Sequence, residues 1–267
     1  YLEDNNKYTE SFMGQHAGFA DNLYNEMLGR IKQTDTSVPY KLGEYWYFVK
    51  TEEGKQYPTF LRGKAKDGSD AVVLLDQNEM AKGFKYFAIG EFDVSDDGNI
   101  LAFSTDTTGY RQYTLQFKDL RTGHVLPDKI ERATSLAWAN DNKTAFVVTE
   151  DATSKRSDLL WRHTLGGKTD KLFEEKDVLF NLGVGRSRDG KMLFAGSYAK
   201  TSREYRYLPS DAPAGEWKVI APRREGHEYS ADYDMGEFYI TTNQDAENCK
   251  VMRASASDPS DRSMPVT

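Results

Sequence analysis

The serines and histidines are the residues that could carry hydrolytic chemistry. A serine nucleophile on a strand-to-helix elbow needs the pattern Gly-x-Ser-x-Gly, and no serine among the 267 residues has it. Gly196-Ser197-Tyr198 comes nearest and lacks the second glycine. The histidines are spread along the chain, and none lies three to five residues from another histidine or from the cysteine, as zinc ligands do. The sequence therefore offers no catalytic residue and no metal site.

Two further motifs resemble ligand-binding loops in part. Asp93-Val-Ser95-Asp-Asp97-Gly98 begins like a calcium loop, but its twelfth position is Ser104, where a bidentate glutamate is required. Gly183-Val-Gly185 begins like a dinucleotide loop, but Arg188 stands in place of the third glycine and no βαβ unit surrounds it. We interpret both segments as turns, and we expect no cofactor-binding residue and no cofactor.

Charge and composition narrow the class of protein. Acidic residues outnumber basic ones by 42 to 35, for a formal net charge of −7, and no sustained basic run could hold a phosphate backbone, which argues against nucleic acid as a partner. No apolar stretch approaches the roughly 20 residues of a membrane helix, so we expect no membrane partner. The single cysteine, Cys249, allows no internal disulfide. This favours the cytoplasm, with the periplasm as the other location.

The elements along the chain change character near residue 37. Before it, apolar side chains recur at helical spacing, including Tyr8, Phe12, Phe19 and Leu23, and predict an amino-terminal helical segment over residues 1–37. We expect Gly14 and Gly18 to divide it into two helices. After it, short runs of aromatic and β-branched residues alternate with glycine, aspartate and asparagine turns to the end, which is typical of strands.

The β-rich part is built of repeats. Each repeat carries a tight turn just before a hydrophobic strand, and the second turn residues are spaced by 55, 44, 48 and 46 residues, at Gly43, Gly98, Asn142, Gly190 and Gly236. Such turn residues suit the positive φ of a two-residue hairpin. Because a four-stranded sheet cannot bury both faces alone, the period predicts the blades of a β-propeller. A β-sandwich with accidental spacing is the alternative.

We therefore expect an all-β protein, a β-propeller preceded by a short α-helical segment. The propeller would occupy residues 38–267 as five blades with boundaries at about 38–85, 86–130, 131–176, 177–222 and 223–267. The chain opens on Tyr1 rather than Met, and its last strand fades into a Ser-, Asp- and Pro-rich stretch. We therefore expect a fragment that is cut inside the fifth blade or its linker.

Many ordered strings resemble the oligopeptidase B group of the prolyl oligopeptidase family of serine peptidases. They run from end to end of the chain, and include Tyr1-Leu-Glu-Asp-Asn-Asn-Lys-Tyr8, Thr51-Glu-Glu-Gly-Lys-Gln-Tyr-Pro58, Lys118-Asp-Leu-Arg-Thr-Gly123, Trp138-Ala-Asn-Asp141 and His227-Glu-Tyr-Ser230. The resemblance implies the first five blades of a seven-bladed propeller. It also implies a separate α/β-hydrolase domain, absent here, that carries the catalytic triad and most of the pocket for Lys or Arg.

The resemblance implies that this chain is the non-catalytic, substrate-gating portion of a peptidase that cleaves short peptides after Lys or Arg. We expect it to be inactive alone and to meet peptide substrates through the missing domain. Two long polar connections, Thr105–Gln112 and Thr149–Asp158, are candidates for the rim that faces that domain. Their candidate interdomain or gating contacts are Arg111, Glu150, Asp151, Lys155 and Arg156, although exposed charged loops are usually only solvated.

An alternative in another class is a stand-alone propeller that binds peptides or proteins. A ring closed by the fifth unit, with the helices packed on it, would distinguish this module from a gating portion. If the ring is incomplete, blade faces and the apolar stripe of the helices are uncovered, and we expect self-association through them.

Overall fold

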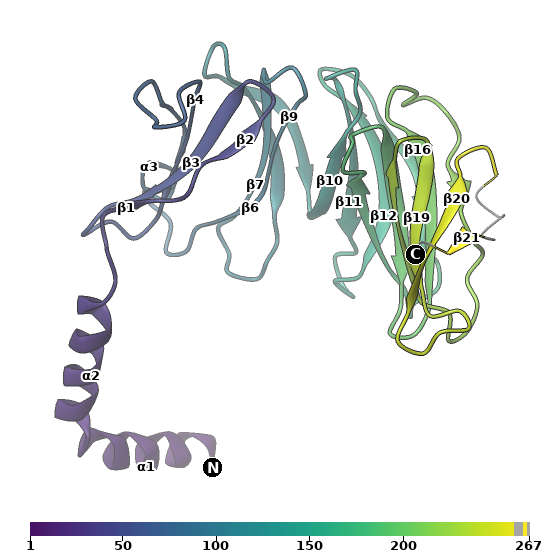
Figure 1. Ribbon diagram of the computed structural model, residues 1–267. Coiled ribbons are helices and arrows are strands. Elements are labelled where there is room, and N and C mark those ends of the chain that lie inside the picture. Colours follow the sequence, from purple (N-terminus) through teal and green to yellow (C-terminus); the bar gives the residue numbers. More distant parts are fainter. Residues whose placement is uncertain (259–263, 266–267) are drawn as a thin grey trace. The chain divides into compact units, whose positions relative to one another are not determined.

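The strands form five antiparallel sheets, and each sheet is built from consecutive segments of the chain (Figure 1). The computed structural model describes residues 1–258 and 264–265. These residues divide into two compact units, residues 1–42 with 46–78 and residues 43–45 with 79–267. In the described part of the chain, no helix has the length and apolar character needed to cross a membrane.

The amino-terminal segment forms two helices, α1 (Leu2–Gly14) and α2 (Ala17–Gly29). The predicted division into two helices is confirmed, but Gly18 lies inside α2 and the break falls at Gln15–His16. No side chain of either helix is buried, and their large apolar residues are exposed except for the half-buried Leu28. The apolar stripe that the spacing predicted is thus present without a covering partner among the described residues.

The first sheet along the chain belongs to the first unit. Two short strands lie on one side of its strand β3 in place of a single longer strand. Two short strands, β1 and β2, both pair with β3, which is followed by β4 and β5. The elements are β1 (Asp35–Thr36), β2 (Tyr40–Leu42), β3 (Tyr45–Thr51), β4 (Thr59–Gly63) and β5 (Val72–Asp76), and a short helix, α3 (Gln77–Met80), follows them.

The second unit contains four sheets of four strands, each in sequence order. The first of these four sheets consists of β6 (Ala88–Val94), β7 (Ile100–Asp106), β8 (Thr114–Asp119) and β9 (Val125–Glu131). The second consists of β10 (Ala133–Trp138), β11 (Thr144–Glu150), β12 (Ser157–Thr164) and β13 (Thr169–Glu174). The third consists of β14 (Asn181–Arg186), β15 (Met192–Tyr198), β16 (Arg203–Pro209) and β17 (Lys218–Val219). The fourth consists of β18 (Tyr229–Asp234), β19 (Glu237–Thr242), β20 (Lys250–Ser255) and β21 (Met264–Pro265).

These four sheets pack face to face in chain order. Because side chains alternate along a strand, Ala145 and Val147 of β11 join a core with the preceding sheet, whereas Phe146 and Val148 join a core with the following one. A third core, around Phe238, joins the last two sheets. Strands buried on both faces exclude a two-layer sandwich, and the predicted propeller blades are confirmed. The predicted blade boundaries, which extend into residues outside the described part, stay a prediction.

The turns differ in detail from the expected two-residue hairpins. Met235-Gly236, with φ of 51° and 90°, closes such a hairpin directly, between Asp234 and Glu237. Two residues, Gly43-Glu44, also join the paired strands β2 and β3, and Gly43 has a φ of 58°. At Gly98 the closing bond runs from the Ser95 N–H to the Ile100 carbonyl, so the loop has four residues, and the turns at Asn142 and Gly190 are built alike. The positive φ predicted for these residues is present at all three. The calcium-like motif is therefore a turn, as interpreted.

The interpretation of Gly183-Val-Gly185 as a turn is wrong. Both glycines lie inside β14, paired with Gly196 and Phe194 of β15, and neither has a left-handed φ. Glycine weakens a strand interior, so the pattern favoured a turn, but pairing and packing with the neighbouring strands override that preference.

Candidate functional site

The sheets of the second unit have two chemically different ends. One end, named here the loop face, carries the connections over residues 81–87, 107–113, 151–156, 175–180, 199–202, 220–228 and 243–249. The opposite end, the hairpin face, carries the tight turns. Large exposed apolar side chains gather on or beside the loop face, at Phe84, Tyr86, Tyr110, Val178, Leu179 and Tyr198, whereas the hairpin face has Val125 and Met235. Exposed apolar groups concentrated on one end are typical of an interaction surface.

Arg111 stands on the loop face because Asp106 folds the preceding loop. The Asp106 carboxylate, which is fully buried, accepts hydrogen bonds from the N–H groups of Thr108 and Arg111, both at 2.8 Å, and from the Thr108 hydroxyl at 2.7 Å. Burial alone would raise the pKa of Asp106, but these hydrogen bonds lower it overall. They hold Arg111 at a φ of 59° with its side chain exposed.

The other four predicted contacts lie at the loop after β11. Two of them have exposed side chains, and the side chains of Glu150 and Arg156 bind other residues of the propeller. Asp151 and Lys155 are exposed. The Asp151 carboxylate accepts the N–H groups of Ser154 and Thr153, which lower its pKa together with the Ser154 hydroxyl. Glu150 instead pairs with Arg132 at 3.2 Å. Arg111 makes no ion pair with any of these residues in the part of the chain that the structure describes.

Arg156 points into the protein. Its guanidinium donates hydrogen bonds to the carbonyls of Glu175 at 2.8 Å and Phe180 at 2.9 Å, and it lies 3.2 Å from the Asp158 carboxylate. Arg156 therefore fixes the neighbouring connection over 175–180, which carries the exposed Val178 and Leu179. The Arg156 guanidinium therefore lies beneath the loop face and is not part of its exposed surface.

A buried charge network that the sequence did not reveal lies beside this connection. The Glu175 carboxylate, 4% exposed, pairs with Arg223 at 2.5 Å, and Arg223 also lies 3.5 Å from Glu204, which pairs with Arg206 at 2.5 Å. Burial tends to raise the pKa of Glu175, but hydrogen bonds from Arg223 and Ser197 lower it overall. The network joins the connections that precede β14 and β18. Because its partners are up to 48 residues apart, no local sequence pattern could have found them.

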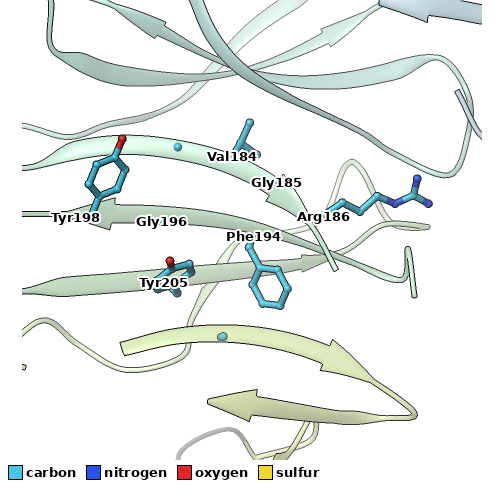
Figure 2. A pocket seen from close by; sticks show the side chains of 9 residues that line it. Val184, Gly185, Arg186, Phe194, Gly196, Tyr198 and Tyr205 are labelled. Atoms are coloured by element: carbon cyan, nitrogen blue, oxygen red, sulfur yellow. The ribbon is translucent and has the colours of Figure 1, made fainter. Parts of the chain in front are cut away.

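A cleft of about 290 Å³ opens on the sheet of β14 to β17, on the side that faces the sheet of β18 to β21 (Figure 2). Gly183, Gly185 and Gly196 contribute bare backbone to it, and the rings of Phe194, Tyr198 and Tyr205 line it together with Ala231 of β18. Arg186 lies at its edge, but its guanidinium is bound by the Asp96 carboxylate in two bonds of 2.7 Å and by the Gly190 carbonyl at 2.8 Å. The cleft is therefore neutral and largely apolar.

A larger hollow of about 580 Å³ lies on the hairpin face and has several carboxylates in its wall. These carboxylates already have partners: Asp141 accepts from Lys143 and Thr144, and Asp119 pairs with Arg121. Asp128 accepts from the Gly166 N–H at 2.8 Å and lies 3.1 Å from His163 Nε2. Among the described residues, no group of three or more His, Cys, Asp or Glu side chains is placed to hold a metal ion.

Four-stranded antiparallel sheets that pack face to face in chain order define the chain as a β-propeller module. The family model described as the prolyl oligopeptidase, N-terminal beta-propeller domain, matches residues 1–266, and the chain belongs to this family. The resemblance read from the sequence is thus confirmed.

Relatives of known name agree with the family. The chain is 38% identical to dipeptidyl aminopeptidase BI of Pseudoxanthomonas mexicana, over 95% of this chain and 38% of the relative. It is 30% identical to Protease 2 of Moraxella lacunata, over 98% of this chain and 39% of the relative. Oligopeptidase B from Leishmania major has a similar structure, with a TM-score of 0.90 and 26% identity over 100% of this chain and 39% of that one. The chain spans about two fifths of the length of these proteins.

Proposed function

We propose that this chain is the substrate-gating propeller of a serine-type oligopeptidase, and that its loop face docks against the catalytic domain. The observation that carries the proposal is the concentration of exposed apolar side chains on the loop face, beside the exposed charges of Arg111, Asp151 and Lys155. An apolar surface with a charged border is the usual composition of an interface between domains.

The construction beneath the loop face supports this role. Arg156 and the network of Glu175, Arg223, Glu204 and Arg206 tie the connections to the sheets below. A surface held in one conformation loses little entropy on docking. Arg111, Asp151 and Lys155 can then form ion pairs across the interface that break when the domains open. Glu150 and Arg156 act from within the propeller.

The exposed helices support docking at a second place. Phe12, Phe19, Leu23 and Met27 are between 44% and 69% exposed, although they occupy the apolar stripe of α1 and α2. We infer that this stripe packs against the catalytic domain, which would bury it. Substrate size would then be limited by a stiff propeller wall, since blades with cores on both faces deform little.

Cleavage after Lys or Arg is the specificity we propose, because the sequence resemblance to oligopeptidase B implies it. Two structures similar to this chain are of oligopeptidase B. The name dipeptidyl aminopeptidase BI of the 38% identical relative supports a competing specificity, the release of dipeptides from an amino terminus. We place the protein in the cytoplasm, with the periplasm as alternative.

Hydrolysis assays on this chain and on the full-length protein test the proposal. Three substrates suffice: an amino-blocked fluorogenic peptide ending in Arg, a dipeptide reporter with a free amino terminus, and a folded protein with an exposed Arg-containing loop. We expect the full-length protein to cleave the first substrate and to spare the folded protein, and this chain alone to cleave none.

Other results would overturn parts of the proposal. Cleavage of the dipeptide reporter alone would replace the specificity after Lys or Arg. Rapid cleavage of the folded protein would remove the gating role. A full-length protein without peptidase activity that still binds peptides would favour the stand-alone binding module.

A further inference from the structure

The cleft in Figure 2 contains one glycine, Gly185, whose missing side chain leaves open space. A Cβ at Gly196 would lie 3.1 Å from the Tyr205 ring, and a Cβ at Gly183 would lie 3.6 Å from the Tyr198 ring. A Cβ at Gly196 would therefore crowd the Tyr205 ring, whereas a Cβ at Gly183 would make an ordinary van der Waals contact with Tyr198. A Cβ at Gly185 would meet no atom within 4 Å, and its φ is one that any residue adopts. Glycine inside a strand often marks the close approach of a ligand.

The repeat shows what the other blades place at these positions. Counted back from the turn residues Gly98, Asn142 and Gly190, the position of Gly185 corresponds to Asp93 in β6 and Ala137 in β10. The position of Gly183 corresponds to Ser135, whose hydroxyl accepts the N–H of Val184 at 3.0 Å and so joins β10 to β14. Gly183 has no side chain to reach the next inner strand, β18, and the cleft lies at that place.

The edge of β18 supplies a polar group to the cleft. The N–H of Tyr233 bonds to the Asp232 carboxylate at 2.8 Å rather than to β19. Because N–H directions alternate along an antiparallel strand, and no bulge interrupts the pairing of β18 with β19, the N–H of Ala231 also points away from β19. Ala231 lines the cleft, and its N–H is equivalent to the Val184 N–H that Ser135 binds one blade earlier.

We propose that this cleft is a subsite for the peptide substrate, which takes one neutral aromatic side chain over Gly185 and one substrate carbonyl at the Ala231 N–H. The occupant is neutral because the Arg186 charge is already bound by Asp96, and in Figure 2 the Arg186 side chain extends away from the tyrosine rings. The rings of Phe194, Tyr198 and Tyr205 offer the edges and faces that an aromatic group prefers. About 290 Å³ is at the lower limit for ligand pockets and suits one side chain. This inference rests on the proposed peptidase function.

Filling the cleft tests the proposal in the full-length protein. Gly185→Leu places a side chain in the open space, and Gly185→Ala is a smaller change that keeps the test valid if leucine prevents folding. Val219→Leu, on the outer strand of the same sheet, is the matched control. Amino-blocked fluorogenic peptides ending in Arg are compared in pairs. The two members of a pair differ at one position before the Arg, which is Phe in one and Ala in the other, and each such position is tested in turn. Binding of N-acetylphenylalanine amide to the same proteins is measured by NMR.

We expect the wild type to prefer Phe at one position by about tenfold in kcat/KM, the scale of discrimination by an apolar pocket. Gly185→Leu should lower kcat/KM for the Phe peptide to that for the Ala peptide, abolish the binding of the amide and keep the melting temperature. The control should behave as wild type. A preference that survives Gly185→Leu and Gly185→Ala, or equal losses on both peptides, would overturn the subsite. Absence of any hydrolysis with retained amide binding would refute only the peptidase function.

Discussion

Replacing Asp93 by asparagine should stabilise the propeller at alkaline pH. Asp93 lies on β6 opposite the fully buried Ala102, and burial is the main reason that its pKa rises from 3.8 to about 6. The charge of Asp96 adds to the rise, while Arg186 and the Val94 N–H oppose it. Arg186 helps little because it is paired with Asp96 at 2.7 Å.

The magnitude follows from linkage between protonation and folding. A rise of about 2 pKa units corresponds to about 3 kcal/mol, as an upper limit. Above pH 6 the folded protein carries the unfavourable charge, whereas below about pH 4 both the folded and the unfolded states are protonated. Asp93→Asn should therefore raise the free energy of unfolding by up to about 3 kcal/mol near pH 8 and change it little near pH 4. Urea unfolding followed by tryptophan fluorescence measures both values.

Asp141→Asn is the control of opposite sign. Burial opposes ionisation of Asp141 too, but bonds from the Lys143 N–H and the Thr144 hydroxyl and N–H lower its pKa. Its stabilising effect is present above pH 4 and is lost as the pH falls through its lowered pKa. This variant should therefore be destabilised near pH 8 and approach wild type in acid. If Asp93→Asn destabilises near pH 8, or acts equally at both pH values, the reasoning about its burial is refuted.

Three further predictions concern the loop face and the helices. Arg223→Met leaves the Glu175 carboxylate buried and without this guanidinium, and should cost about 3 kcal/mol in urea unfolding; a cost below about 1 kcal/mol would show that the network adds little. Arg156→Lys should speed amide hydrogen exchange over residues 175–180 about tenfold, and unchanged exchange would contradict the proposed fixing of that connection. Phe19→Ser with Leu23→Ser should lower the self-association of this chain in light scattering, whereas association at the wild-type level would place the contact elsewhere.

Much of the fold could be predicted because its signals are local. The turns at Gly98, Asn142 and Gly190 need a positive φ, which few residues tolerate, so their spacing predicted the blades. The hydrophobic run Ala145–Val148, directly after such a turn, predicted the strand that the structure has over Thr144–Glu150. The helical stripe before residue 37 predicted α1 and α2.

The rest depends on contacts between distant residues. A charged loop predicts only exposure, so the inward turn of Arg156 onto the Phe180 carbonyl was not foreseen. Arg223 and Glu175 meet across 48 residues. Gly185 was interpreted as part of a turn because an isolated glycine pattern does not reveal strand partners. The contacts of Arg111, Asp151 and Lys155 with a catalytic domain stay predictions, because they depend on residues of that domain.

Amide hydrogen exchange, compared between this chain and the same residues in the full-length protein, tests the docking of the loop face most directly. We expect added protection in the full-length protein over residues 107–113, 151–156 and 175–180 and in α2, and no added protection over the turns at 96–99, 140–143 and 188–191. Protection confined to those turns, or unchanged exchange in both sets, would contradict the account.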